Sequence, residues 1–170
     1  MKKKHRKNEI IKRLLIVYYS ATMLYLLFVR GRGPVGALSY WEQVMNNYNL
    51  EPFHTISNYW DILTRPEYYL DKFGAASIYS TQARISIVNL LGNIVMFIPL
   101  GFLLPLIWRK LRKLWKSFLT ATGIILLVEM AQLFTLRGSC DIDDLILNLC
   151  GVIIGYALWR MVHFLRCKRK

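Results

Sequence analysis

The chain is poor in acidic residues and in cysteine. Its 170 residues include 10 Asp and Glu against 23 Lys and Arg, which gives a formal net charge of +13. Its 3 cysteines are too few for a small disulfide-stapled fold, and no internal repeat or sustained heptad is present. By contrast, 55% of the residues are hydrophobic and the mean hydropathy is +0.30. This composition excludes a disordered chain and is too apolar for a small soluble core, so it predicts a membrane protein.

Long apolar stretches dominate the sequence. A helix of about 20 predominantly apolar residues crosses a hydrocarbon core of about 30 Å. We therefore expect an all-α integral membrane protein, with about four transmembrane helices in a bundle and an aromatic outer loop at residues 30–85. The expected transmembrane helices are residues 10–29, 86–108, 117–136 and 142–165.

The first apolar stretch follows a basic arm, residues 1–9, so a cleaved signal peptide is the alternative to a membrane anchor. The stretch is longer than the apolar region of a signal peptide, which has about 7 to 15 residues, and no small-x-small cleavage site precedes Arg30. The sequence therefore favours an anchor. The transmembrane domain then covers residues 10–165, and a basic tail, 166–170, follows it.

Lys and Arg are unevenly distributed among the segments that join the apolar stretches. Most of them lie in the N-terminal arm, in the link at residues 109–116 and at the C-terminal end. Lys and Arg concentrate in the cytoplasmic segments of membrane proteins. We therefore expect both termini in the cytoplasm and the loop outside, in a multi-pass protein of the cell membrane. Topology and contact with the lipid bilayer then explain the positive charge, and no nucleic-acid partner is expected.

The outer loop is rich in aromatic residues and is not of low complexity. Amphipathic pieces that lie in the outer membrane interface are one interpretation, because aromatic rings favour the headgroup level. An ordinary folded extracellular cap is the alternative. The aromatic residues are Trp41, Tyr48, Phe53, Tyr59, Trp60, Tyr68, Tyr69 and Phe73.

Polar side chains within the apolar stretches are the main functional signal, because hydrocarbon offers them no hydrogen-bond partner. Asn89 and Asn93 are four residues apart and share one helical face, and Glu129 and Gln132, three residues apart, share another. The fourth apolar stretch begins with a further stripe, whose residues are three or four positions apart and therefore share one helical face. The stripe is polar at its outer end and has small residues deeper in the membrane, where another helix is expected to approach closely. This stripe consists of Asp141, Asp144, Asn148, Gly151 and Gly155.

The expected topology brings these polar groups into the outer half of the bundle. Asp141 also suits a helix N-cap, whereas Asp143 lies off the stripe and is expected on the solvated surface. Arg137 is either the partner of Glu129 or an interfacial anchor, and plain hydrogen bonding between helices is the alternative for the amides. The candidate binding residues are Asn89, Asn93, Glu129, Gln132, Arg137, Asp141, Asp144 and Asn148.

These residue types limit the chemistry that such a site can perform. Carboxylate and amide oxygens suit Mg²⁺ or Ca²⁺, so a divalent cation is a candidate cofactor, although no metal ligand is assigned. No Ser-His-Asp, Cys-His or HExxH pattern is present, and Glu129 is the one candidate catalytic base. A non-catalytic membrane factor is therefore favoured. The alternative is a metal-assisted enzyme that acts on lipid phosphate or pyrophosphate, while a flippase is disfavoured by the lack of an inverted repeat.

Four motifs occur together in residues 46–160: Asn49-Leu50-Glu51-Pro52-Phe53-His54-Thr55-Ile56, the segment 89–105 with Pro99-Leu100-Gly101-Phe102, the pair in Glu129-Met130-Ala131-Gln132, and the polar string 137–155. In combination they resemble the VanZ-like family of bacterial membrane proteins. The resemblance implies a protein of the cell envelope in the class that gives low-level resistance to glycopeptide antibiotics such as teicoplanin.

The resemblance and the expected topology together suggest a hypothesis for the ligand. Envelope precursors of a Gram-positive wall present a polyprenyl pyrophosphate and a terminal peptide carboxylate at the outer face, and Arg137 suits bidentate contact with either group. We therefore expect a polar pocket in the outer leaflet that modulates glycopeptide susceptibility. Its expected partner is a lipid-linked wall precursor or a protein of wall synthesis.

Overall fold

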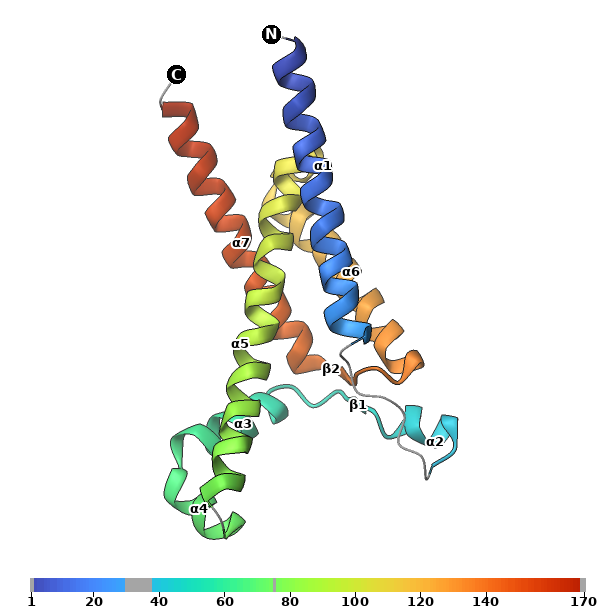
Figure 1. Ribbon diagram of the computed structural model, residues 1–170, viewed down its shortest axis with the longest axis vertical. Helices are drawn as coiled ribbons and strands as arrows, with labels where there is room; N and C mark the ends of the chain where they lie inside the picture. Colours follow the sequence, from blue (N-terminus) through green and yellow to red (C-terminus); the bar gives the residue numbers. More distant parts are fainter. Residues whose placement is uncertain (1, 30–37, 75, 169–170) are drawn as a thin grey trace.

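The computed structural model describes residues 2–29, 38–74 and 76–168. Within these residues, four helices are long and apolar enough to cross a membrane, and they bear out the expected all-α membrane architecture (Figure 1). Helix α1 (Lys2–Leu24) continues into a short π-helical segment, η1 (Tyr25–Val29). The other three long helices are α5 (Ala76–Ile107), α6 (Leu114–Thr135) and α7 (Ile142–Lys168).

Helix α5 begins ten residues before the expected start at residue 86. Its first turns contain polar residues such as Gln82 and Arg84, so a criterion of apolar length does not include them. These turns pack against the loop helices α3 (His54–Thr64) and α4 (Pro66–Phe73). The Tyr79 hydroxyl, for example, donates a hydrogen bond to the Ile62 carbonyl at 3.2 Å. Contacts with the loop therefore extend the helix beyond the apolar segment.

The expected outer loop is folded over most of its described length. It contains α2 (Tyr40–Met45), the two-residue strand β1 (Tyr48–Asn49), α3 and α4. Ser39 caps α2 in a capping box with Glu42, and Pro66 occupies the first turn of α4, where a missing N–H has no cost. Figure 1 shows these elements at one end of the bundle, with both chain termini at the other.

A short parallel strand pair joins the loop to the bundle. Strand β2 (Cys140–Asp141) lies between α6 and α7, and Asn49 of β1 pairs with Asp141 of β2. The Cys140 N–H donates to the Asn47 carbonyl at 3.0 Å, and the Asn47 amide donates to the Gly138 carbonyl. Segments about 90 residues apart in sequence are thereby fixed beside each other at the start of α7.

Helices α5 and α7 make the most extensive helix–helix contact in the structure. A Cβ at Gly151 would overlap the Ile94 carbonyl, and a Cβ at Gly155 would overlap the Ile98 carbonyl. Gly101 on α5 meets the Val152 backbone in the same way. The predicted close approach along the Gly151 and Gly155 stripe is therefore confirmed, and it brings two backbones into direct contact.

The apolar core lies where the four long helices meet. Its buried members come from α1, α5, α6 and α7. Large apolar side chains elsewhere on these helices are exposed, as a lipid-facing surface requires. The core residues are Met23, Phe97, Leu100, Leu104, Ala121, Ile125 and Val152.

Candidate functional site

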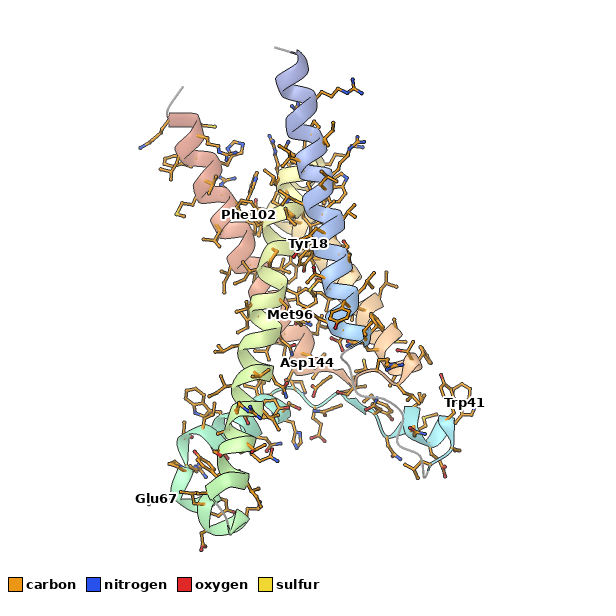
Figure 2. All side chains as sticks on the ribbon, viewed as in Figure 1. Tyr18, Trp41, Glu67, Met96, Phe102 and Asp144 are labelled. Carbon is orange, nitrogen blue, oxygen red and sulfur yellow. The ribbon has the colours of Figure 1, made fainter. Side chains whose placement is uncertain are left out.

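One cavity of about 370 Å³ opens at the end of the bundle that carries the strand pair. Helices α3, α5, α6 and α7 and the turn between α6 and β2 surround it. Figure 2 shows Asp144, one of its lining residues, near the centre of the molecule, whereas Trp41 and Glu67 lie at the outer edges. We call this cavity the polar pocket. All eight candidate binding residues line it: Asn89, Asn93, Glu129, Gln132, Arg137, Asp141, Asp144 and Asn148.

Amide side chains connect the helices around the polar pocket. The Asn93 amide of α5 donates to the Asp144 carboxylate of α7. The Asn89 amide donates to the Tyr59 hydroxyl of α3 at 2.7 Å. Gln132 donates to the Leu27 carbonyl at 3.3 Å. Hydrogen bonding between segments, the alternative to ligand binding, is therefore one role of these three amides.

Glu129 and Asn148 have hydrogen-bonding capacity that the protein does not use. Glu129 is 4% exposed and Asn148 is 3% exposed. The Asn148 amide donates to Glu129 Oε1 at 3.4 Å. Within the part of the chain that the structure describes, Glu129 Oε2 and Asn148 Oδ1 accept no hydrogen bond. Buried polar atoms in proteins are nearly always satisfied, so two unsatisfied oxygens in one cavity indicate a place for a hydrogen-bond donor.

Asp141 joins the strand pair to α3 and α7. Its Oδ2 accepts a hydrogen bond from the Thr55 hydroxyl at 2.6 Å, and a weaker one from the Asn49 amide at 3.5 Å. Its Oδ1 accepts the Asp143 backbone N–H at 2.9 Å. The N-cap predicted for Asp141 is therefore confirmed. The same carboxylate also holds α3 against the polar pocket.

The expectation that Asp143 lies on the solvated surface is wrong. Asp143 is 0% exposed. One carboxylate oxygen accepts the Phe53 N–H at 2.6 Å, and the other accepts the Ile56 N–H at 3.0 Å. These amides begin α3, whose N-cap residue, Phe53, provides no side-chain hydrogen bond of its own. Asp143 therefore caps a helix from a distant part of the chain, which the spacing on α7 alone does not reveal.

Arg137 lies at the mouth of the polar pocket and is exposed. It follows the C-cap of α6, where Leu136 adopts the left-handed conformation at φ 54°. The two salt bridges formed among the described residues are Lys12 with Glu9 and Arg65 with Asp61, so Arg137 does not pair with Glu129. The polar pocket thus combines the carboxyl groups of Glu129, Asp141 and Asp144 with one guanidinium at its rim.

The described residues contain no group of three or more His, Cys, Asp or Glu side chains arranged to hold a metal ion. A divalent cation therefore remains a hypothesis from residue type, and no arrangement of ligands favours it.

A family model described as VanZ/LLP1 matches residues 16–163. The chain belongs to the VanZ/LLP1 family. The match includes all eight candidate residues and extends back to residue 16, so it also covers the later part of α1 and all of η1, which lie outside the resemblance at residues 46–160. Searches of curated proteins and of solved structures found no match to the chain.

Besides Ser139 in the turn before β2, two polar residues of α3 in this VanZ/LLP1 protein line the polar pocket and are not among the candidates, Thr55 and Tyr59. They are four residues apart and so share one helical face. Thr55 belongs to the motif that precedes α5, which was the available signal. The sequence marks Tyr59 only as an aromatic residue of the loop, because its contact with Asn89 depends on how α3 folds back onto α5.

Cys140 lies beside the polar pocket in β2 and is partly buried. Burial raises the pKa of its thiol above the ordinary value, and the nearby Glu129 and Asp141 carboxylates raise it further. The thiolate is therefore scarce at neutral pH, so Cys140 is expected to be a slow nucleophile.

Proposed function

We propose that this VanZ/LLP1 protein modulates glycopeptide susceptibility through the polar pocket, which binds the headgroup of a lipid-linked wall precursor at the outer leaflet. The observation that carries the proposal is the pair of buried acceptor oxygens, Glu129 Oε2 and Asn148 Oδ1, that the protein leaves unsatisfied inside a cavity. A purely structural network would be expected to satisfy both of them. The glycopeptide role comes from the family resemblance.

The charge distribution supports an outward-facing pocket. The basic N-terminal arm, the basic turn η2 (Arg109–Arg112) and the C-terminal end of α7 lie at the opposite end of the bundle (Figure 1). Because basic segments remain in the cytoplasm, the end with the polar pocket faces the exterior. Exported wall precursors present their headgroups on that side.

The size and lining of the polar pocket support headgroup recognition. Its volume of about 370 Å³ lies in the range of small-molecule sites, roughly 300 to 1,000 Å³. Leu27, Phe97 and Val128 provide apolar lining beside the polar groups. The exposed guanidinium of Arg137 is placed for bidentate contact with a carboxylate or phosphate that enters from the membrane surface.

The test is teicoplanin and vancomycin susceptibility of a sensitive host that expresses the wild type or single variants, with membrane abundance measured by immunoblot. Glu129→Gln and Arg137→Ala are expected to lose the resistance of the wild type at unchanged abundance. The matched controls Glu67→Gln and Arg84→Ala change exposed residues that do not line the polar pocket, and they should keep it.

Two results would contradict the proposal. Full resistance in well-expressed Glu129→Gln and Arg137→Ala would remove the polar pocket from the mechanism. No resistance from the wild type would remove the glycopeptide role, while membership of the family would stand.

A further inference from the structure

We propose that the polar pocket binds a primary ammonium group, which donates hydrogen bonds to Glu129 Oε2 and Asn148 Oδ1. This inference rests on the proposed function and names the chemistry of the ligand. An ammonium carries three N–H donors and no acceptor. It therefore complements a cavity lined by two buried acceptor oxygens that receive no hydrogen bond from the described residues.

Four side-chain donors that line the polar pocket, three amides and one hydroxyl, are engaged within the protein, while the Arg137 guanidinium at the rim is exposed. The amides of Asn89, Asn93 and Gln132 each donate to a protein acceptor. The Thr55 hydroxyl donates to Asp141. A ligand that presents only acceptors to these four groups would compete with existing hydrogen bonds, whereas a ligand that donates to Glu129 Oε2 and Asn148 Oδ1 would complete the network.

The charge of the polar pocket also favours a cation. Three carboxyl groups line it, against one guanidinium that is exposed at the rim. Like charges brought together without solvent repel strongly, so a phosphate is not expected beside Glu129. We expect an anionic part of the same ligand to remain outside, near Arg137, while its ammonium enters. A headgroup with both charges matches this arrangement.

The geometry favours an ammonium over a divalent metal ion. Ca²⁺ takes about 6 to 8 oxygen ligands and Mg²⁺ takes an octahedral set of about six, whereas the described residues group no three acidic, His or Cys side chains for a metal. It also favours a primary over a quaternary ammonium, because the latter has no N–H to donate and is recognised by aromatic cages. The aromatic lining consists of Tyr59 and Phe97.

The test uses the full chain in nanodiscs of phosphatidylglycerol, a lipid without an ammonium. One arm adds soluble ethanolamine, and the other incorporates phosphatidylethanolamine. Choline and phosphatidylcholine are the matched probes that keep the positive charge and lack N–H donors. The readout is the thermal unfolding midpoint, followed by tryptophan fluorescence, because a ligand that binds the folded state raises it.

We expect a saturable rise in Tm with the primary amine and none with its quaternary counterpart. A rise in both arms, or in the soluble arm alone, means that the free ammonium suffices, and a rise with phosphatidylethanolamine alone means that a lipid must present it. Glu129→Gln should abolish the rise, whereas Glu67→Gln, at an exposed site outside the polar pocket, should preserve it. Equal responses to primary and quaternary amines, or no response in either arm, would overturn the proposal.

A second variant covers the case in which Glu129→Gln fails to fold. Gln132→Lys places a tethered ammonium in the polar pocket and keeps an N–H donor near the Leu27 carbonyl. It should raise Tm without ligand and remove the response to ethanolamine, and an undiminished response would count against the proposal.

The two proposals can fail separately. If antibiotic susceptibility depends on Glu129 but no amine binds, the ammonium proposal is wrong and the proposed function stands. If amine binding depends on Glu129 but Glu129→Gln has no effect on antibiotic susceptibility, the glycopeptide role is wrong and the ammonium site stands.

Discussion

Asp143 provides the sharpest test of how the start of α3 is held against α7. Its carboxylate accepts the N–H groups of Phe53 and Ile56 at 2.6 Å and 3.0 Å, and it is fully buried. Phe53 itself adopts the left-handed conformation at φ 65°, which costs a non-glycine residue about 1 to 2 kcal/mol. Asp143→Ala removes the acceptor that compensates for this strain. We therefore expect the start of α3 to separate from α7.

The size of the effect follows from the two lost bonds. A hydrogen bond to a charged group contributes about 1.5 to 3 kcal/mol. The variant also no longer has the desolvation cost of a buried carboxylate, so the net loss of stability is smaller than the sum of the two bonds. A net loss of about 3 kcal/mol corresponds to roughly a 100-fold larger open population of α3. Asp143→Asn keeps one acceptor oxygen, so about half of the free energy and roughly a tenfold change are expected.

Hydrogen exchange measured by mass spectrometry on the protein in nanodiscs tests this prediction. The amides of α3 (His54–Thr64) should lose protection by roughly 100-fold in Asp143→Ala, while α6 and the later turns of α7 keep theirs. Asp71→Ala, at an exposed position on α4, is the matched control and should change nothing. If the Asp143→Ala protein is inserted in the nanodisc and its α3 amides exchange at the wild-type rate, the reasoning is refuted.

Two further predictions concern packing and topology. Gly101→Ala should destabilise the bundle by about 1 to 3 kcal/mol in chemical unfolding, because its Cβ would overlap the Val152 backbone. The control is Gly92→Ala on the same helix, whose Cβ meets no atom within 4 Å and which should be neutral or slightly stabilising. Equal effects of the two substitutions would contradict the contact between Gly101 and Val152. In variants that keep one cysteine, an impermeant maleimide should label Cys140 but not Cys167 on intact cells. Because burial and the nearby carboxylates raise the pKa of its thiol, the labelling rate at Cys140 should still be rising with pH where an ordinary exposed thiol has levelled off. The reverse labelling would place the polar pocket in the cytoplasm.

The expected membrane helices agree with the structure because hydropathy is a property of each segment alone. A run of about 20 apolar residues has to cross the bilayer as a helix, whatever its neighbours are. The spacing of Glu129 with Gln132, and of Asp144 with Asn148, likewise fixes which residues share a face, since helical periodicity is local. The eight candidate residues therefore line one cavity in the fold.

Local rules failed where the decisive partner is distant in sequence. Asp143 lies off the polar stripe of α7, yet it is buried because amides 90 and 87 residues earlier meet its two oxygens. Tyr59 enters the polar pocket because α3 folds against α5, a contact across 30 residues.

The sequence by itself determined the number of long membrane helices, the asymmetry of charge and the polar faces, because each of these follows from composition or from the helical period. Only the tertiary structure decided how the aromatic loop folds, that Asp143 caps α3, and that Glu129 Oε2 and Asn148 Oδ1 are left without a partner among the described residues. Hydrogen bonds and burial belong to pairs of segments, and the free energy of bringing those segments together is not encoded in the period of either one.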